Sequence, residues 1–526
     1  MSVRITTLDN GMRVATDSMQ HVETVTLGTW VGIGARDEAA EVNGISHLLE
    51  HMVFKGTERR TARQIAEEIE AVGGHLNAYT SRENTAYYAK VLKGDIDLAV
   101  DLVSDIVMHA TMDPTELERE KSVICQEIHQ AHDTPDDIVF DLFQEAAYPE
   151  QPIGRPVLGT EEIVRSLDRK DVEGYRAQSY TAPHSLFCAA GNVDHDHLVE
   201  VIANTFDTLP TRNGNGREAA RYKGGDIRME RDLEQVHIVL GLEGVGYGED
   251  DFYAASVLST LFGGGMSSRL FQEVREERGL AYSIYSFLSC YEDGGIFGIY
   301  AGTGGDELGE LIPILAGEAE KVIETLSPEE TERARAQLKA SILMARESTS
   351  ARTEQMARHL MLFGRPLDPD EIVGKIEAVD DDAVRAVARR IFRGTPSVAA
   401  IGPLQGLESP DTLAQRFNGR DGAASRQFSD FPGIVRSPPA STGVRSRPRS
   451  DDRRRQDHGQ FRERGKADHR RRGDRTSDRR SQRRSGNLNR APLSPAFERH
   501  VGDSGNFVGG HRAGLALLQR IEMEKI

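Results

Sequence analysis

The sequence predicts an α+β protein composed of two homologous mixed α/β domains, followed by a disordered C-terminal tail. Its 526 residues exceed what a single hydrophobic core normally supports. Strand-like and helix-like segments follow one another in a similar order twice along the chain, as expected for an internal repeat. Beyond about residue 423 the composition changes abruptly. These observations predict a first domain over 1–209, a linker over 210–224, a second domain over 225–423 and a tail over 424–526.

The first domain begins with a predicted β-hairpin. Two short alternating runs flank Asp9-Asn10-Gly11, and an Asn-Gly pair is typical of a tight turn. A helix is expected to begin at Asp113-Pro114, because proline is well tolerated in the first helical turn. The remaining patterns predict strands over 25–38, 75–92 (a pair) and 183–193, and helices at the histidine motif 47–51 and over 61–73 and 116–131.

The second domain repeats this order. EQVHIVLGLEGVGYGED, residues 234–250, resembles the earlier VTLGTWVGIGARDE in being an apolar strand that ends in glycine and acidic residues. A helix over 252–265, a strand pair over 280–303, further helices and a closing strand over 397–404 are expected to follow. The glycine run 263–265 lacks the Lys-Ser/Thr of a phosphate-binding loop, so we expect a turn or a mobile loop there.

The segment with the most specific chemistry is His47-Leu48-Leu49-Glu50-His51. Histidines four residues apart share one helical face, with β-carbons roughly 5 to 6 Å apart. Both imidazoles can therefore bind one metal ion, and Glu50 beside them can take a proton from metal-bound water. H-x-x-E-H is the inverted form of a zinc-protease motif. The alternative is an ordinary amphipathic helix whose histidines are capped or solvated.

A catalytic zinc ion usually has three protein ligands and a water molecule, so this motif needs one more ligand. The best candidate is Glu127. Glu120, two helical turns earlier on nearly the same face, could hold a ligating histidine by a hydrogen bond. Spacing alone does not separate these two from Glu116 and Glu118, and glutamates on a helix are usually solvated.

Three stretches in this order resemble the pitrilysin family of zinc peptidases, most closely its mitochondrial processing peptidase branch (beta-subunit-like) and the bacterial homologues. They are NGISHLLEHMVFKGT, EAVGGHLNAYTSRENTAYYAKVL and EREKSVICQEI. The resemblance covers roughly residues 1–420. It implies that His47, His51 and Glu127 bind one Zn²⁺ per chain, with Glu50 as general base and Glu120 as supporting acid. It also implies the processing-peptidase-like metallohydrolase fold, with its two domains in a clam-shell arrangement.

The resemblance also implies residues that bind substrate. MSSRLFQEVREERGLAYSIYS is similar to the stretch in which family members place an arginine and a tyrosine seven residues apart, here Arg275 and Tyr282. A guanidinium and a phenol are suitable donors to a substrate carbonyl and to the oxyanion formed from it. LNAYTSRE is similar to the family's exposed edge strand, and Asn77 and Ala78 match positions that contact the substrate backbone.

A further pair of acids implies a preference for arginine. Asp137 and Asp141 match positions where the processing peptidase recognises an arginine near the cleaved bond. Asp137 departs from the family pattern, because a longer acid is typical there. The alternative for both is a solvated helix face.

We therefore expect a zinc-dependent endopeptidase that hydrolyses extended peptides or presequence-like segments, with a preference for a nearby arginine. The alternative is a non-catalytic scaffold or partner subunit of the same family, because some relatives have lost the metal site. A homodimer is also compatible with the family.

The distribution of charge and apolar residues limits which other functions, such as nucleic-acid or membrane binding, can be expected. Residues 445–484 contain 17 Lys or Arg against 7 Asp or Glu, so the rest of the chain is more acidic than the net charge of -18. We interpret this Arg-rich tail as an aberrant extension, for example from out-of-frame translation. The alternative is a basic tail that binds nucleic acid or membrane, and nucleic-acid binding is expected only through this segment. No apolar run approaches the roughly 20 residues of a membrane span, and no secretory signal is evident, so the expected location is the cytoplasm.

Overall fold

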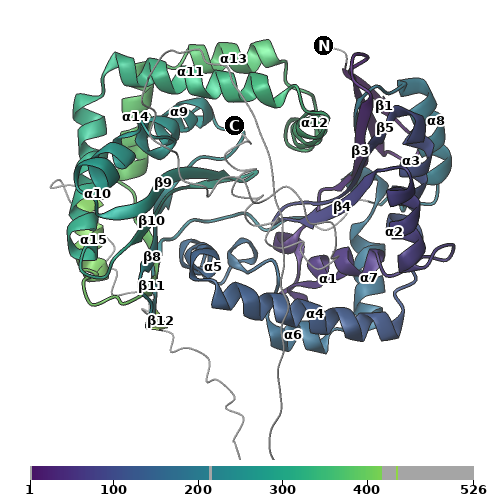
Figure 1. Ribbon diagram of the computed structural model, residues 1–526, viewed down its shortest axis with the longest axis horizontal. Helices are drawn as coiled ribbons and strands as arrows, with labels where there is room; N and C mark the ends of the chain where they lie inside the picture. The colour runs from purple at the N-terminus through teal and green to yellow at the C-terminus, as the bar shows by residue number, and fades with distance from the viewer. Residues whose placement is uncertain (1–2, 213–215, 418–433, 436–526) are drawn as a thin grey trace, which may run out of the picture. The chain divides into compact units, whose positions relative to one another are not determined.

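The computed structural model describes residues 3–212 and 216–417 in full, together with the backbone of residues 434 and 435 (Figure 1). These described residues belong to one compact unit. They form two six-stranded mixed sheets, one in each half of the chain, with helices packed against them. None of the helices in this part of the chain is long and apolar enough to cross a membrane.

The first sheet has the strand order β1-β2-β6-β3-β5-β4. The predicted hairpin is present, with β1 and β2 antiparallel around Gly11, whose φ of 94° suits glycine. At the opposite edge lies β4, which pairs only with β5 among the described strands. The strands are β1 (Val3–Thr7), β2 (Arg13–Ser18), β3 (Thr24–Val31), β4 (His75–Thr80), β5 (Thr85–Leu92) and β6 (Ser185–Gly191).

Side-chain caps mark the start of α2 and α4 in the first half. Thr61 caps α2, and the carboxylate of Asp113 accepts hydrogen bonds from the first backbone amides of α4. The helices are α1 (Ile45–Val53), α2 (Ala62–Ala71), α3 (Ile96–His109), α4 (Pro114–Asp133), α5 (Pro135–Ala147), α6 (Glu161–Ser166), α7 (Arg169–Ser179) and α8 (His195–Thr205).

The second sheet has the order β12-β7-β11-β8-β10-β9, and its strands from β7 to β9 repeat the topology of β2-β6-β3-β5-β4. The edge strand differs, because β12 is parallel to β7 whereas β1 is antiparallel to β2. β7 runs parallel to β11 as β2 runs parallel to β6, and β8 is antiparallel to both neighbours as β3 is. This match confirms two homologous α/β domains. The strands are β7 (Gly225–Glu230), β8 (Val236–Glu243), β9 (Ala281–Cys290), β10 (Gly295–Thr303), β11 (Ser397–Gly402) and β12 (Ile434–Val435). Apart from β12, the predicted tail lies outside the described residues.

Helices also dominate the second half. The glycine run 263–265 ends α9 and leads into a turn, as predicted, and a π-helix, Phe271–Glu277, follows. The helices are α9 (Phe252–Gly263), α10 (Leu308–Thr325), α11 (Pro328–Ala345), α12 (Thr349–Phe363), α13 (Pro369–Glu377), α14 (Asp381–Phe392) and α15 (Pro410–Phe417).

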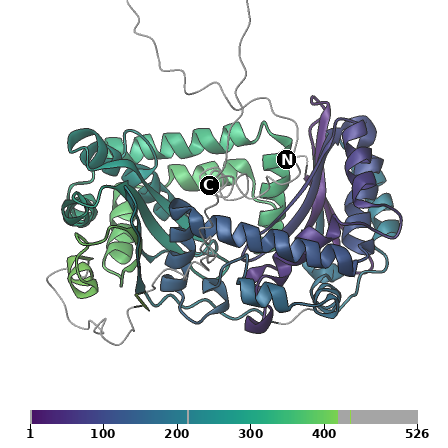
Figure 2. The same ribbon diagram turned by 60° about the horizontal axis from the view of Figure 1, so that its bottom comes forward.

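Each sheet is covered on one face by a helix from the other half of the chain. α12 packs on β3 and β6 of the first sheet, and α5 packs on β7, β8 and β11 of the second (Figures 1 and 2). The α5 contact is close, because a β-carbon at Gly241 in β8 would lie 2.3 Å from the Phe143 ring. The domain limits at residues 209 and 225 stay a prediction. α5 and α12 each pack on the sheet of the other half, so contacts cross these limits.

A buried ionic cluster also joins the halves. The fully buried guanidinium of Arg36 donates to Glu83 at 2.5 Å and to Asp293 of the second half at 2.7 Å. Arg217, in the predicted linker, donates to both carboxylate oxygens of Asp37 at 2.9 Å. Paired and hydrogen-bonded charges of this kind tolerate burial, whereas removing one partner is costly.

Candidate metal centre

The helix that carries the histidine motif is anchored at its start by Glu38. The Glu38 carboxylate accepts hydrogen bonds from the backbone amides of Gly44 and Ser46 and from Asn43 Nδ2, each at 2.8 Å. These bonds satisfy amides that a helix N-terminus leaves unpaired. Burial nevertheless raises the pKa of Glu38 to about 7. Glycine is favoured at position 44, just before this helix, because its φ is 97° and a β-carbon there would lie 2.7 Å from the Leu158 carbonyl oxygen.

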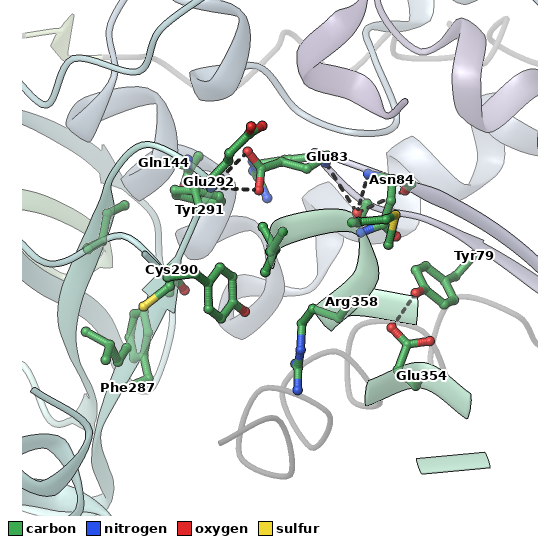
Figure 3. A pocket seen from close by; sticks show the side chains of 18 of the residues that line it. Tyr79, Glu83, Asn84, Gln144, Phe287, Cys290, Tyr291, Glu292, Glu354 and Arg358 are labelled. Atoms are coloured by element: carbon green, nitrogen blue, oxygen red, sulfur yellow. Dashed lines mark hydrogen bonds between the residues drawn. The ribbon is translucent and has the colours of Figure 1, made fainter. Parts of the chain in front are cut away.

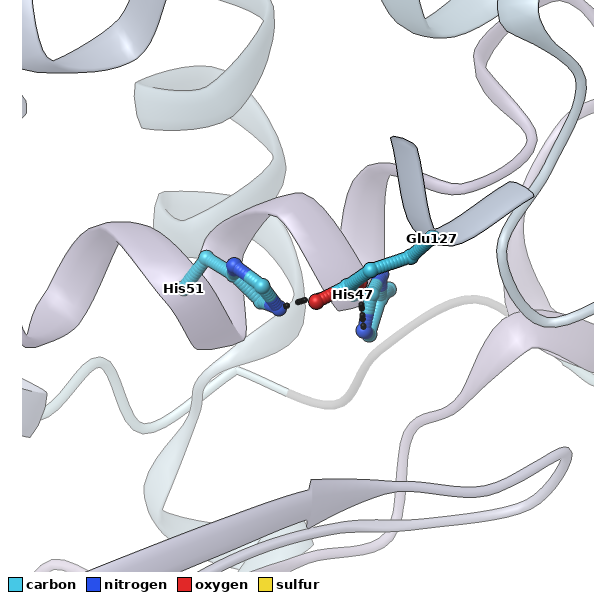
Figure 4. Close-up of side chains that lie close together, drawn as sticks. All are labelled: His47, His51 and Glu127. Atoms are coloured by element: carbon cyan, nitrogen blue, oxygen red, sulfur yellow. Dashed lines mark ion pairs between the residues drawn. The ribbon is translucent and has the colours of Figure 1, made fainter. Parts of the chain in front are cut away.

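His47 and His51 lie one turn apart on α1 and face Glu127 of α4 (Figure 4). Glu127 Oε2 is 3.8 Å from His47 Nε2 and 3.6 Å from His51 Nε2. Each of the three side chains offers an atom within 4.8 Å of the others, a grouping found once in the described part of the chain. Two imidazoles and a carboxylate are a ligand set typical of catalytic zinc.

Glu120 lies behind His51 and fixes its ring. One oxygen of Glu120 is 3.0 Å from His51 Nδ1, and the other is 2.8 Å from Lys55 Nζ. Burial would raise the pKa of Glu120, but the hydrogen bonds from His51 and Lys55 outweigh it and lower that pKa. With Nδ1 engaged, Nε2 of His51 is the ring nitrogen that faces Glu127.

Glu116 and Glu118, the other two glutamates of α4 that spacing allowed as ligand candidates, have different surroundings. Glu116 pairs with Arg119 on the same helix, and Glu118 is 2.7 Å from Lys121 with its side chain 71% exposed. The structure therefore brings Glu120 and Glu127 to the histidines, and leaves Glu116 and Glu118 in local ion pairs.

Glu50 is half-buried beside this group and is held by strand β4. Thr80 Oγ1, at the end of β4, donates a 2.6 Å hydrogen bond to Glu50 Oε2. Burial raises the pKa of Glu50, and the charge of Glu127 adds to this rise, while His51 and Thr80 act against it. A carboxylate with a raised pKa is suited to accept and return a proton near neutral pH.

Asn77 and Ala78 lie in the middle of β4, at the edge of the first sheet. Asn77 is exposed, and its Oδ1 accepts a 2.9 Å hydrogen bond from the Ala78 amide. An edge strand presents backbone groups to which an extended peptide can add.

A cavity of about 900 Å³ is lined by residues of both halves and reaches only the last two residues of β4, Tyr79 and Thr80 (Figure 3 shows Tyr79). Both predicted specificity acids, Asp137 and Asp141, line it. Asp141 Oδ1 is 3.3 Å from Arg82 Nη2, so this carboxylate already has a cationic partner within the chain.

Arg275 and Tyr282 are stacked on one another. The Arg275 guanidinium lies 5.1 Å from the centre of the Tyr282 ring and 4.7 Å from that of Phe271, and Tyr282 is 77% exposed. Within the described residues, no hydrogen bond or ion pair joins this pair to His47, His51 or Glu127.

Three supporting residues escaped the sequence analysis. Lys55 lies four residues after His51, and helical spacing could have indicated it. Glu38 and Thr80 reach α1 from a preceding turn and from a strand, and neither carries a local sequence signal.

Comparisons with known proteins agree on one family. Two family models match the sequence, one described as Insulinase (Peptidase family M16) over residues 13–161 and one as Peptidase M16 inactive domain over 166–338. An uncharacterized zinc protease of Rickettsia felis is 39% identical over 400 residues, covering 76% of this chain and 97% of the relative. A probable mitochondrial-processing peptidase subunit beta of Arabidopsis thaliana is 38% identical over 429 residues, covering 78% and 81%.

Solved structures show the same fold. A protease from Helicobacter pylori matches with a TM-score of 0.72 at 20% identity, over 76% of this chain and 99% of that chain.

Glu38 should make stability depend on pH. Its folded-state pKa of about 7 lies above the ordinary 4.5, so the protonated carboxyl stabilises the fold at low pH, and this contribution is lost as pH rises from about 4.5 through about 7. The melting temperature of the wild type minus that of Glu38→Gln should therefore decrease over this range. A difference that is constant or increases with pH would contradict the assignment.

Proposed function

The chain belongs to peptidase family M16, and we propose that it is a zinc-dependent endopeptidase that hydrolyses extended peptides or presequence-like segments. The observation that carries this proposal is the convergence of His47, His51 and Glu127 beside the carboxylate of Glu50. Zinc proteases among the relatives support zinc as the cofactor.

One zinc ion per chain is proposed, with His47, His51 and Glu127 as its ligands. The donor chemistry fits zinc, and Glu120 would hold the ring of His51 in its ligating orientation. Zinc bound there would polarise the scissile carbonyl and lower the pKa of a water molecule.

The proton is moved by Glu50. Its carboxylate takes a proton from the attacking water and then delivers it to the leaving amine. Thr80 orients Glu50 through their 2.6 Å hydrogen bond. Arg275 and Tyr282 are proposed as donors to the substrate carbonyl and to the oxyanion. Sequence resemblance and their mutual stacking support this role.

Substrate is proposed to bind as an added strand along β4. The position of β4 at the sheet edge, next to a cavity of about 900 Å³, supports this mode for an extended peptide. Asn77 and Ala78 would contact its backbone. Asp137 and Asp141, which line the cavity, would recognise an arginine side chain.

A non-catalytic scaffold or partner subunit is not favoured, because the two histidines and both glutamates of the site, Glu50 and Glu127, are all present. The homodimer and a nucleic-acid role for the tail stay predictions from sequence.

The general base can be separated from the metal ligands by mutation. Glu50→Gln should retain zinc but lose roughly a hundredfold to ten-thousandfold in kcat, because the amide cannot take the proton. His47→Ala, His51→Ala and Glu127→Ala should lose both zinc and activity. The exposed His129, also on α4, pairs with Glu161, so His129→Ala is the matched control and should keep both. Zinc is quantified by mass spectrometry, and hydrolysis with fluorogenic peptides, with and without a chelator. Wild-type turnover by Glu50→Gln would refute the assignment.

Arginine preference is tested with paired peptides that differ only by arginine or its neutral analogue citrulline. A charge-assisted hydrogen bond contributes about 1.5 to 3 kcal/mol, so Asp137→Asn should reduce the ratio of the two kcat/KM values by roughly tenfold or more. Asp136→Asn, at an exposed neighbour, should leave the ratio unchanged. An unchanged ratio in both Asp137→Asn and Asp141→Asn would exclude these acids from specificity.

A further inference from the structure

A carboxylate from the second half of the chain holds two residues of the first sheet. Glu354, on α12, accepts a 2.7 Å hydrogen bond from the Tyr79 hydroxyl and a 3.0 Å hydrogen bond from Trp30 Nε1 (Figure 3 shows the first). The ring of Tyr88 packs near both aromatic rings, with centroids 6.4 Å from each. The hydrogen bond to Glu354 and the neighbouring Tyr88 ring together restrain Tyr79.

Tyr79 immediately precedes Thr80, the residue that donates to Glu50. Side chains alternate between the two faces of a strand, so neighbours in sequence face opposite ways. Tyr79 packs in the cluster that contains Trp30 and α12, whereas Leu76 and Ala78 pack in the core beneath α1. Thr80 shares their face of the sheet and reaches α1.

β4 needs such support because it is an edge strand. Its only strand neighbour in the described structure is β5, so the ladder restrains it from one side. A shift of the backbone at Tyr79 would be transmitted directly to Thr80 and to the carboxylate that it orients. Displacements near 1 Å in a reacting group can cost about a hundredfold in rate.

We propose that Glu354 is a positioning residue for the general base, acting through Tyr79 and Thr80 on Glu50. This inference rests on the proposed peptidase function. It makes the chemistry of the first half depend on a helix of the second half. Glu354 itself touches no reacting group in this scheme.

The test compares Glu354→Ala, Tyr79→Phe and Thr80→Val in the full zinc-loaded chain. Each should lower kcat for a fluorogenic peptide by roughly tenfold with zinc content unchanged, because only the orientation of the base is lost. Glu354→Ala combined with Thr80→Val should be no slower than Thr80→Val alone, as expected for residues on one path. Glu354→Gln, which keeps one acceptor oxygen, should recover part of the rate.

Arg352→Gln is the matched control. Arg352 also lies on α12 and also contacts the first half, but it pairs with Asp17 of β2 at 2.9 Å. It should retain kcat within about twofold even though the pair is largely buried and its loss lowers stability, because neither residue contacts β4. A loss in Arg352→Gln equal to that in Glu354→Ala would overturn the proposal, since helix docking alone would then explain both.

Two further outcomes separate this inference from the proposed function. Two outcomes would overturn only the inference, provided that the wild type hydrolyses the peptide. One is an unchanged kcat in Glu354→Ala and Tyr79→Phe. The other is a double variant, Glu354→Ala with Thr80→Val, whose loss of kcat is the full sum of the two single losses. Absence of hydrolysis by the zinc-loaded wild type would overturn the peptidase function and this inference with it. If Glu354→Ala does not fold, Tyr79→Phe and the double variant Tyr79→Phe with Thr80→Val separate the same two outcomes.

Discussion

Each of the two sheets requires a helix from the other half to cover its second apolar face. A sheet buried on both faces cannot leave one of them to water. α12 supplies that cover for the first sheet and α5 for the second. The buried cluster around Arg36 adds charged contacts between the same halves, and these are costly to break singly. The position of the β4 edge relative to α1 therefore depends on residues from both halves.

The metal centre gathers negative charge where water is scarce. Three carboxylates, Glu50, Glu120 and Glu127, lie around two histidines, and burial raises the pKa of both Glu50 and Glu127. Glu120 keeps a lowered pKa because His51 and Lys55 donate to it. A divalent cation would offset the repulsion among these groups. Burying these carboxylates without a cation costs free energy, and Glu127 is also a proposed ligand of the cation. This arrangement favours a metal site over an ordinary helix surface.

Local sequence signals predicted much of the fold and part of the site. The hairpin at Gly11, the helix after Asp113 and the pairing of His47 with His51 each follow from rules that span a few residues. The duplicated order of strands predicted the two homologous domains. Spacing did not choose Glu127, because α4 carries four glutamates and the sequence of this helix does not show which of its faces meets α1. Family resemblance singled out Glu120 and Glu127, and the packing of α4 against α1 brings these two to the histidines.

Other features could not be predicted, because they join distant segments. Glu354 is 275 residues from Tyr79 in the chain, and nothing in the sequence around either residue marks the pairing. α5 precedes the linker yet packs on the second sheet, and no pattern in its own sequence indicates which sheet it covers. Thr80 donates a hydrogen bond to Glu50 because the fold places the end of β4 against α1.

In the proposed enzyme, α1 and α4 together form one zinc site next to a general base on α1. The most direct measurement is anomalous diffraction at the zinc edge from crystals of the zinc-loaded protein. The account predicts a single ion per chain, bound by His47 and His51 nitrogens at about 2.0 to 2.1 Å and by a Glu127 oxygen at about 2.0 to 2.2 Å. Zinc bound elsewhere, or without Glu127, would contradict it.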